Sequence, residues 1–147
     1  MSMLPRALAV AAVLWPVAMG AAVVDRVAHE DGVVSAIVYT AASRICHQRP
    51  DRSFHSSGHP WPVCGRCSGL YLAAPFGAWA GRRWWPRRVS ARVGIVLAAV
   101  PTVATLILEF VSPDGVSSVA RAVAALPLGF AVSALIVHAA GGGESIG

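Results

Sequence analysis

Long uninterrupted runs of apolar residues are the feature that most constrains how this chain can fold. Three such runs, 7–24, 93–111 and 122–140, contain no Asp, Glu, Lys or Arg apart from one glutamate near the end of the second. A helix rises 1.5 Å per residue, so about 20 apolar residues cross the roughly 30 Å of hydrocarbon in a bilayer. Each run is therefore predicted to be a membrane-spanning helix.

Two shorter apolar stretches complete the expected bundle. Residues 70–80 reach spanning length only if their helix begins near Cys64, which predicts a fourth span over 64–81. Residues 33–45 are apolar on one face only and too short to span, which is typical of an amphipathic helix on the membrane or against the bundle. The expected fold is all-α, a single integral membrane domain over 1–147 with about four transmembrane helices and one amphipathic helix.

Composition excludes several classes of protein. Hydrophobic residues make up 56% of the chain and charged residues 13%, against roughly 25% charged in soluble domains. A soluble enzyme, a disordered tail and a disulfide-rich secreted scaffold are therefore excluded. The net charge of +5 comes from arginines that lie between the apolar runs. The expected partner is the lipid bilayer rather than nucleic acid, while protein partners and substrate stay open.

Charges near the ends of the spans set the expected topology. Arginine and tryptophan gather in 82–88, which is typical of a membrane interface. With residue 1 inside, each side receives equal numbers of arginines, but those at 82, 83, 87, 88 and 92 surround one short loop and weigh more. We expect a multi-pass protein of the cell membrane with segment 46–67 on the outer face. A cleaved signal peptide over 7–24, or a membrane crossing by 33–45, is the alternative.

Segment 46–67 gathers the residue types that carry chemistry. All three cysteines lie in it, and the spacing Cys64-x2-Cys67 lets two thiolates from one turn reach one ion. Cys46 is the candidate third ligand, and one of three histidines would complete the tetrahedral set that Zn²⁺ accepts: His47, His55 or His59. The arginines 49, 52 and 66 would offset thiolate charge or bind lipid phosphates.

The same segment resembles a known family. Cys46-His47-Gln48, Arg52-Ser53-Phe54, Gly58 and Pro62-Val63-Cys64-x-Arg66-Cys67-x-Gly69-x-Tyr71 are similar to the signature of a small prokaryotic membrane-protein family known only as domain of unknown function twenty eighty-five. The resemblance implies a multi-pass membrane protein, points at these polar residues as the functional set and favours His47 as the fourth ligand. It supplies no reaction. The resulting candidates are metal ligands Cys46, His47, Cys64 and Cys67, supporting or anion-binding residues Gln48, Arg49, Arg52 and Arg66, and further candidates His55, His59 and Tyr71.

Two alternatives to a structural or catalytic zinc site stay open. Cys64 and Cys67 could form the redox pair of a membrane thiol-disulfide oxidoreductase, with Cys46 as a resolving thiol, because Arg66 and a helix N-terminus would lower a thiol pKa. The cysteines could also be small buried apolar residues. Whether the chain is an enzyme is therefore open.

A few further residues carry weaker expectations. Glu109 and His138 lie near the ends of the last two spans, where their side chains are expected to reach the interface by snorkelling. Gly77-x3-Gly81 would let two helices pack closely.

Overall fold

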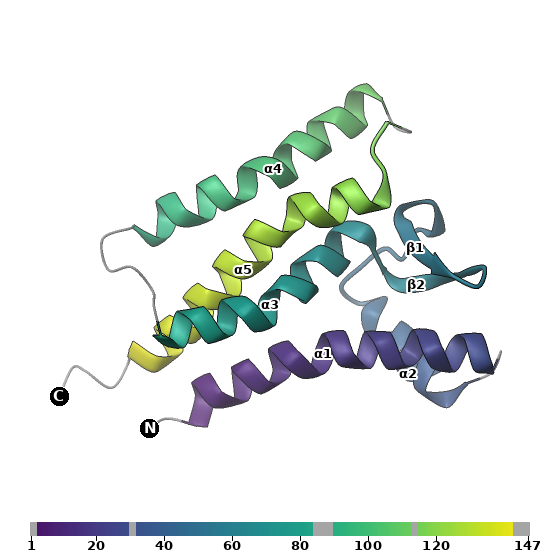
Figure 1. Cartoon of the computed structure of the whole chain (residues 1–147), viewed down its shortest axis with the longest axis horizontal. Helices are drawn as coiled ribbons and strands as arrows, with labels where there is room; N and C mark the ends of the chain where they lie inside the picture. Colours follow the sequence, from purple (N-terminus) through teal and green to yellow (C-terminus); the bar gives the residue numbers. More distant parts are fainter. Residues whose placement is uncertain (1–2, 30–31, 84–89, 113–114, 143–147) are drawn as a thin grey trace.

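The computed structural model describes residues 3–29, 32–83, 90–112 and 115–142, which form a helical bundle with one small sheet at an end (Figure 1). In chain order the elements are α1 (Met3–Ala28), α2 (Val33–Ala42), the short 3₁₀ helix η1 (Pro50–Arg52), β1 (Ser53–Ser56), β2 (His59–Cys64), α3 (Gly65–Arg83), α4 (Ala91–Val111) and α5 (Ser118–Gly142). The expected all-α class is confirmed, with a two-stranded sheet added to it.

Among these helices, α1, α4 and α5 are long and apolar enough to cross a membrane. Large apolar side chains stand exposed along them, as expected where lipid rather than water is the neighbour; Leu14, Leu97 and Phe110 are 59%, 65% and 88% exposed. The helix α3 occupies the segment of the fourth expected span but is less apolar than the other three. It runs alongside α5 through the bundle (Figure 1).

The long helices alternate in direction. The start of α1 and the end of α5 lie at one end of the bundle, while α1 and α4 end, and α3 and α5 begin, at the other (Figure 1). The strands and α2 lie at this second end, which we call the hairpin end. The arginine and tryptophan cluster falls mainly in 84–89, outside the described residues.

The parallel pair of α3 and α5 packs through small residues. A Cβ atom added to any of three α3 glycines would collide with a backbone carbonyl oxygen of α5 (Gly69, Gly77 and Gly81). The Ser133 hydroxyl of α5 also donates a 2.8 Å hydrogen bond to the Ala74 carbonyl of α3. Close backbone approach of this kind provides the van der Waals contact that holds helices together in lipid. The expected role of Gly77-x3-Gly81 is confirmed.

The amphipathic helix α2 is fixed by a carboxylate from α1. Its N-cap residue, Gly32, has no side chain that could accept a hydrogen bond from the first turn. Asp25 of α1 does so instead, and its Oδ2 accepts a 2.8 Å hydrogen bond from the Ser35 N–H. A side-chain oxygen at this position satisfies one of the free N–H groups at a helix start. This contact sets where α2 begins.

The strands β1 and β2 form a hairpin that the hydropathy pattern did not predict. They pair antiparallel, with Ser53 opposite Cys64 and Ser56 opposite His59. The two turn residues, Ser57 and Gly58, have φ angles of 50° and 83°. Positive φ at both positions is the geometry of the type I′ turn, whose twist matches that of paired strands. The hairpin therefore ends with Cys64 at the start of α3.

The expectation that Glu109 snorkels to the interface is wrong. Glu109 is 7% exposed, because its carboxylate is held by arginine side chains from three other elements. His138, by contrast, is exposed near the end of α5.

Candidate metal centre

The sulfur atoms of Cys46, Cys64 and Cys67 lie within 4.8 Å of one another. Cys46 comes from the coil after α2, Cys64 is the last residue of β2, and Cys67 lies in the first turn of α3. The hairpin brings the chain back so that the distant Cys46 meets the Cys64-x2-Cys67 turn. The three elements are thereby joined at one point.

Gln48 positions the segment that carries Cys46. Its φ of 47° lies in the left-handed region, which costs free energy in a residue other than glycine. Its side-chain amide donates hydrogen bonds to the Tyr39 carbonyl (2.7 Å) and to the Pro62 carbonyl (2.9 Å). These two bonds link α2 to β2 and hold the strained backbone. Gln48 is thus a supporting residue of the cluster by geometry.

The sulfurs already interact with one another and with the backbone. The Cys64 N–H donates a hydrogen bond to the Cys46 Sγ at 3.3 Å. A hydrogen bond from the Cys67 thiol lowers the pKa of Cys64 to about 5, helped by the backbone N–H groups of Cys67 and Arg66. A lowered pKa favours the thiolate, which is the form of a cysteine that binds metals and attacks disulfides.

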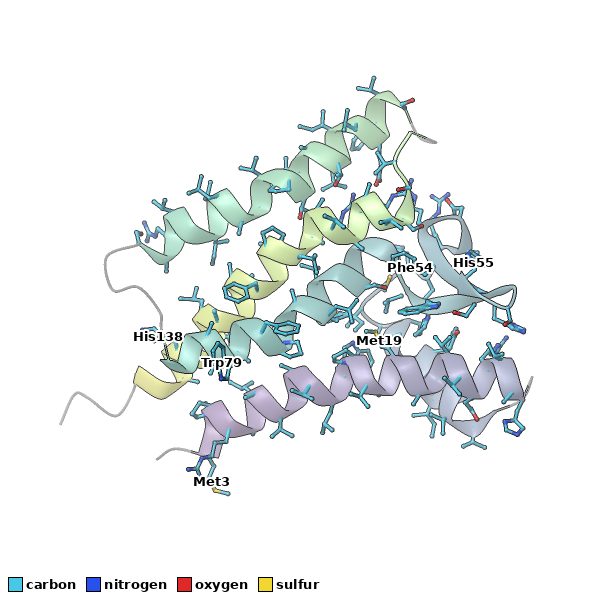
Figure 2. The ribbon with its side chains drawn as sticks, in the orientation of Figure 1. Met3, Met19, Phe54, His55, Trp79 and His138 are labelled. Carbon is cyan, nitrogen blue, oxygen red and sulfur yellow. The ribbon has the colours of Figure 1, made fainter. Side chains whose placement is uncertain are left out.

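Apolar side chains pack against the three cysteines. Met19 of α1, Ala42 and Val63 are buried with Cys46 in one cluster, and Trp15 and Tyr71 pack against it. The Trp15 and Tyr71 rings meet edge to face with centroids 6.0 Å apart. Figure 2 shows Met19 on the face of α1 that is turned toward α3 and the hairpin. Cys46 is buried in this group, whereas Cys64 and Cys67 keep part of their surface exposed.

The spacing of the sulfurs suits a zinc ion. Zinc–sulfur bonds of about 2.3 Å in a tetrahedral site place neighbouring sulfurs about 3.8 Å apart. The three sulfurs, within 4.8 Å of one another, need to close by no more than about 1 Å to reach that geometry. Thiolates are also the ligands that zinc accepts in structural sites. The donor set therefore fits the metal.

The histidines lie outside this group. His47 is exposed beside Cys46, and its ring nitrogens are not among the ligand atoms that converge in the described part of the chain. His55 and His59 lie toward the turn of the hairpin, where His55 is opposite Pro60. At about 3.3 Å per residue, His59 is roughly 16 Å along β2 from Cys64. Figure 2 likewise shows His55 on the hairpin, away from Met19.

The arginines separate into two groups. Arg49 pairs with Asp51 on the exposed surface, at 3.0 Å. Arg52 and Arg66 turn instead toward Glu109, whose Oε2 and Oε1 lie 3.4 and 2.9 Å away. Sequence reasoning missed both Glu109 and Arg121 as members of this group, because their contacts join four elements. The signal that could have found them was a charge inside one apolar run, Glu109, and a charge at the edge of the next, Arg121.

Comparison with known proteins agrees with these features. The sequence profile of the family described as "Predicted membrane protein (DUF2085)" matches residues 46–135. An uncharacterised protein of Methanothermobacter thermautotrophicus is 57% identical over 30 residues, which are 20% of this chain and 27% of that protein. An uncharacterised protein of Methanocaldococcus jannaschii is 46% identical over 44 residues, 30% of this chain and 28% of that protein.

The matched segments thus span about a quarter of the length of these curated relatives. No solved structure matches the chain. The family match begins at Cys46 and includes the other two cysteines, α3, α4 and most of α5. Because it covers more than half of the residues, the chain belongs to this family of predicted membrane proteins of unknown function.

Proposed function

We propose that this membrane protein holds one zinc ion at its hairpin end, with Cys46, Cys64 and Cys67 as three ligands and His47 as the fourth. The observation that carries the proposal is the convergence of three sulfurs from three separate segments beside a cluster of apolar side chains. If the cysteines were only small buried apolar residues, packing would not require their three sulfur atoms to lie next to one another.

The proposed ion is structural. Its ligands lie after α2, at the end of β2 and at the start of α3, so one ion would join all three to the bundle. The hairpin has only four and six residues in its strands, and a two-stranded hairpin is marginal by itself. Zinc bound by thiolates contributes folding free energy directly. The metal would therefore supply the stability that the hairpin end lacks.

His47 is the fourth ligand that needs the least rearrangement. It lies in coil next to Cys46, whereas His55 and His59 are fixed in the strands toward the turn. If His47 stays outside, the fourth position is left to water. A zinc ion with three protein ligands and a water is the arrangement of catalytic sites. The identity of the fourth ligand therefore decides between a structural and a catalytic site.

The proposed centre lies on the outer face of the cell membrane. The end of α3 and the start of α4, with Arg83 and Arg92, lie at the opposite end of the bundle, and positive charge near span ends favours the cytoplasm. The bilayer is the one partner that the proposal requires.

The test measures metal content in the detergent-purified chain by elemental analysis. We expect about one zinc per chain, and we expect Cys64→Ser and Cys67→Ser each to remove it. Replacement of zinc by Co²⁺ should give sulfur-to-cobalt charge-transfer absorption in the wild type. Because that absorption reports thiolate ligands directly, it remains informative where a serine variant is recovered in low yield.

A matched pair of histidine variants tests the fourth ligand. His47→Ala should weaken zinc binding by about tenfold or more, whereas His55→Ala, an exposed histidine on the hairpin, should leave it unchanged. Equal effects of the two variants would remove His47 from the ligand set. Full metal retention in both Cys64→Ser and Cys67→Ser would contradict the zinc centre itself.

Thiol-disulfide oxidoreductase chemistry is the second candidate, favoured by the proximity of Cys64 to Cys67 and by the lowered pKa of Cys64. The two functions differ in what protects the thiols. In a zinc centre the cysteines react with an alkylating reagent only after a chelator is added. In a redox centre the purified chain holds no metal and carries a disulfide between Cys64 and Cys67, which peptide mass spectrometry detects.

A further inference from the structure

Three guanidinium groups meet one carboxylate at the hairpin end, on the side of α3 that faces α4 and α5. Glu109, near the end of α4, is 2.7 Å from Arg121 Nε in α5, 2.9 Å from Arg66 Nη2 in α3 and 3.4 Å from Arg52 Nη1 in η1. The side chains of Glu109 and Arg121 are each 6% exposed. We call these four residues the arginine cluster.

The arginine cluster holds more positive than negative charge. Three arginines and one glutamate give +3 − 1 = +2, and the neighbouring pair of Arg49 and Asp51 adds nothing to this sum. Among the described residues, no further carboxylate is paired with the cluster beyond Asp51, at 3.7 Å from Arg52. Buried charge without a counter-charge is costly. An anion from outside the chain would remove that cost.

Hydrogen-bond donors are also left over. Each guanidinium carries five N–H donors, and one carboxylate cannot accept from all of them. The Arg66 Nε is buried and has no hydrogen-bond partner within the described part of the chain. Arg52, with 34% of its side chain exposed, forms the open side of the cluster. A ligand with several oxygens could therefore enter past Arg52 and accept bonds from more than one arginine.

The position of the arginine cluster indicates which anion it suits. The helices α3 and α5 both begin here, so the positive ends of their dipoles add to the arginine charge. Guanidinium groups bind phosphate oxygens in pairs, with planar geometry that a lysine lacks. The end of the spanning helices is also the depth at which phosphate groups of lipids lie.

We propose that Arg52, Arg66 and Arg121, oriented by Glu109, form a binding site for a phosphate group at the membrane surface. The phosphate could come from a lipid headgroup or from free phosphate, and the recognition chemistry is the same. Arg49 is not part of the site, because it points to Asp51 on the exposed surface. Arg66 lies between Cys64 and Cys67 in the chain, but its side chain turns toward Glu109, so the three thiols are not ligands of this site.

The test compares thermal unfolding of the detergent-purified full chain in sodium phosphate and in sodium chloride of equal ionic strength. A ligand that binds the folded state raises Tm with its concentration. We expect phosphate to raise the Tm of the wild type. Arg52→Gln should weaken the apparent affinity for phosphate by about tenfold or more, the range for a lost charge-assisted hydrogen bond. Arg52→Lys should lie between the two.

The control variant is Arg44→Gln, which removes an exposed arginine from the same end of the bundle. It should respond to phosphate as the wild type does. Arg52 is chosen for the test because it is the outermost arginine, so its replacement leaves the buried contacts of Glu109 with Arg66 and Arg121 intact.

A second arm identifies the source of the phosphate. The same unfolding measurement is made in mixed micelles with dioleoyl phosphatidylglycerol, with dioleoylglycerol as the phosphate-free control. A rise in Tm with the phospholipid alone supports a headgroup site, and a rise with inorganic phosphate alone supports a site for the free anion. No rise with either, or an equal loss of response in Arg52→Gln and Arg44→Gln, would overturn the proposal.

Discussion

Glu109 forms ion pairs with three arginines and is almost fully buried. Replacing one side chain of this group should therefore change the stability of the fold more than replacing a charged residue on the surface. Removing one member of a buried ion pair leaves the others uncompensated, which generally costs more than the pair contributes. Glu109 is the carboxylate that all three arginines share, whereas Glu109 keeps two arginine partners when any one arginine is replaced. This asymmetry gives a prediction that a simple count of ion pairs does not.

We expect Glu109→Gln to lower the free energy of unfolding by about 3 kcal/mol, because the buried arginines lose their counter-charge. Arg121→Gln made in the Glu109→Gln background should restore part of that loss. A double-mutant cycle on detergent-solubilised protein, followed by thermal unfolding, measures the coupling. Strictly additive losses in the double variant would show that the two side chains do not interact.

Residue spacing predicted part of the site and missed part of it. Cys64-x2-Cys67 lies in one turn, so sequence alone indicated that pair, and the meeting with Cys46 agrees with the expected grouping. The positions of His55 and His59 depend on strand register, which spacing does not contain. Arg52 and Glu109 are 57 residues apart, and Arg66 and Glu109 are 43 apart, so only the packing of helices brings them together.

At the scale of elements, the α3–α5 contact depends on the absence of side chains. Gly77 of α3 has no room for a Cβ beside the Phe130 carbonyl of α5, whereas Gly20 of α1 has nothing within 4 Å of that position. Both glycines lie inside helices, where alanine has the higher intrinsic propensity. The same substitution should therefore act in opposite directions at the two sites.

Gly77→Ala should lower the free energy of unfolding by about 1–3 kcal/mol, because α3 and α5 must move apart. Gly20→Ala should leave stability unchanged or raise it by up to about 1 kcal/mol. Thermal unfolding of the two variants in the same detergent provides the comparison. Equal destabilisation by both would mean that close approach of α3 and α5 does not contribute to stability.

The helices were predictable because each needs only local apolar periodicity and length. The hairpin was not, because its strands hold prolines and histidines in place of an alternating apolar pattern. The Ser57-Gly58 dipeptide was the available signal, since serine followed by glycine marks turns. The capping of α2 by Asp25 could not be predicted from local sequence either, because the carboxylate that caps α2 belongs to another helix.

At the scale of the whole molecule, the direction of the helices makes topology testable. The start of α1 and the end of α5 lie at one end of the bundle, and the segment between α4 and α5 lies at the other (Figure 1). We expect alkaline phosphatase fused after residue 147 to be inactive. The end of α3 and the start of α4, with Arg83 and Arg92, lie at the same end of the bundle as the end of α5, and this end should be cytoplasmic. The enzyme fused after residue 117 should be active. Activities in the reverse order would place the cysteines inside the cell.

The parallel pairing of α3 with α5 also bears on how the chain enters the membrane during synthesis. A helix is released into lipid according to its own hydrophobicity, and α3 is the least apolar of the four long helices. Its packing partner is made last, after α4 has already been translated. We therefore expect α3 to remain at the lipid surface or at the insertion machinery until α5 emerges, so that α3 and α5 are integrated as a unit.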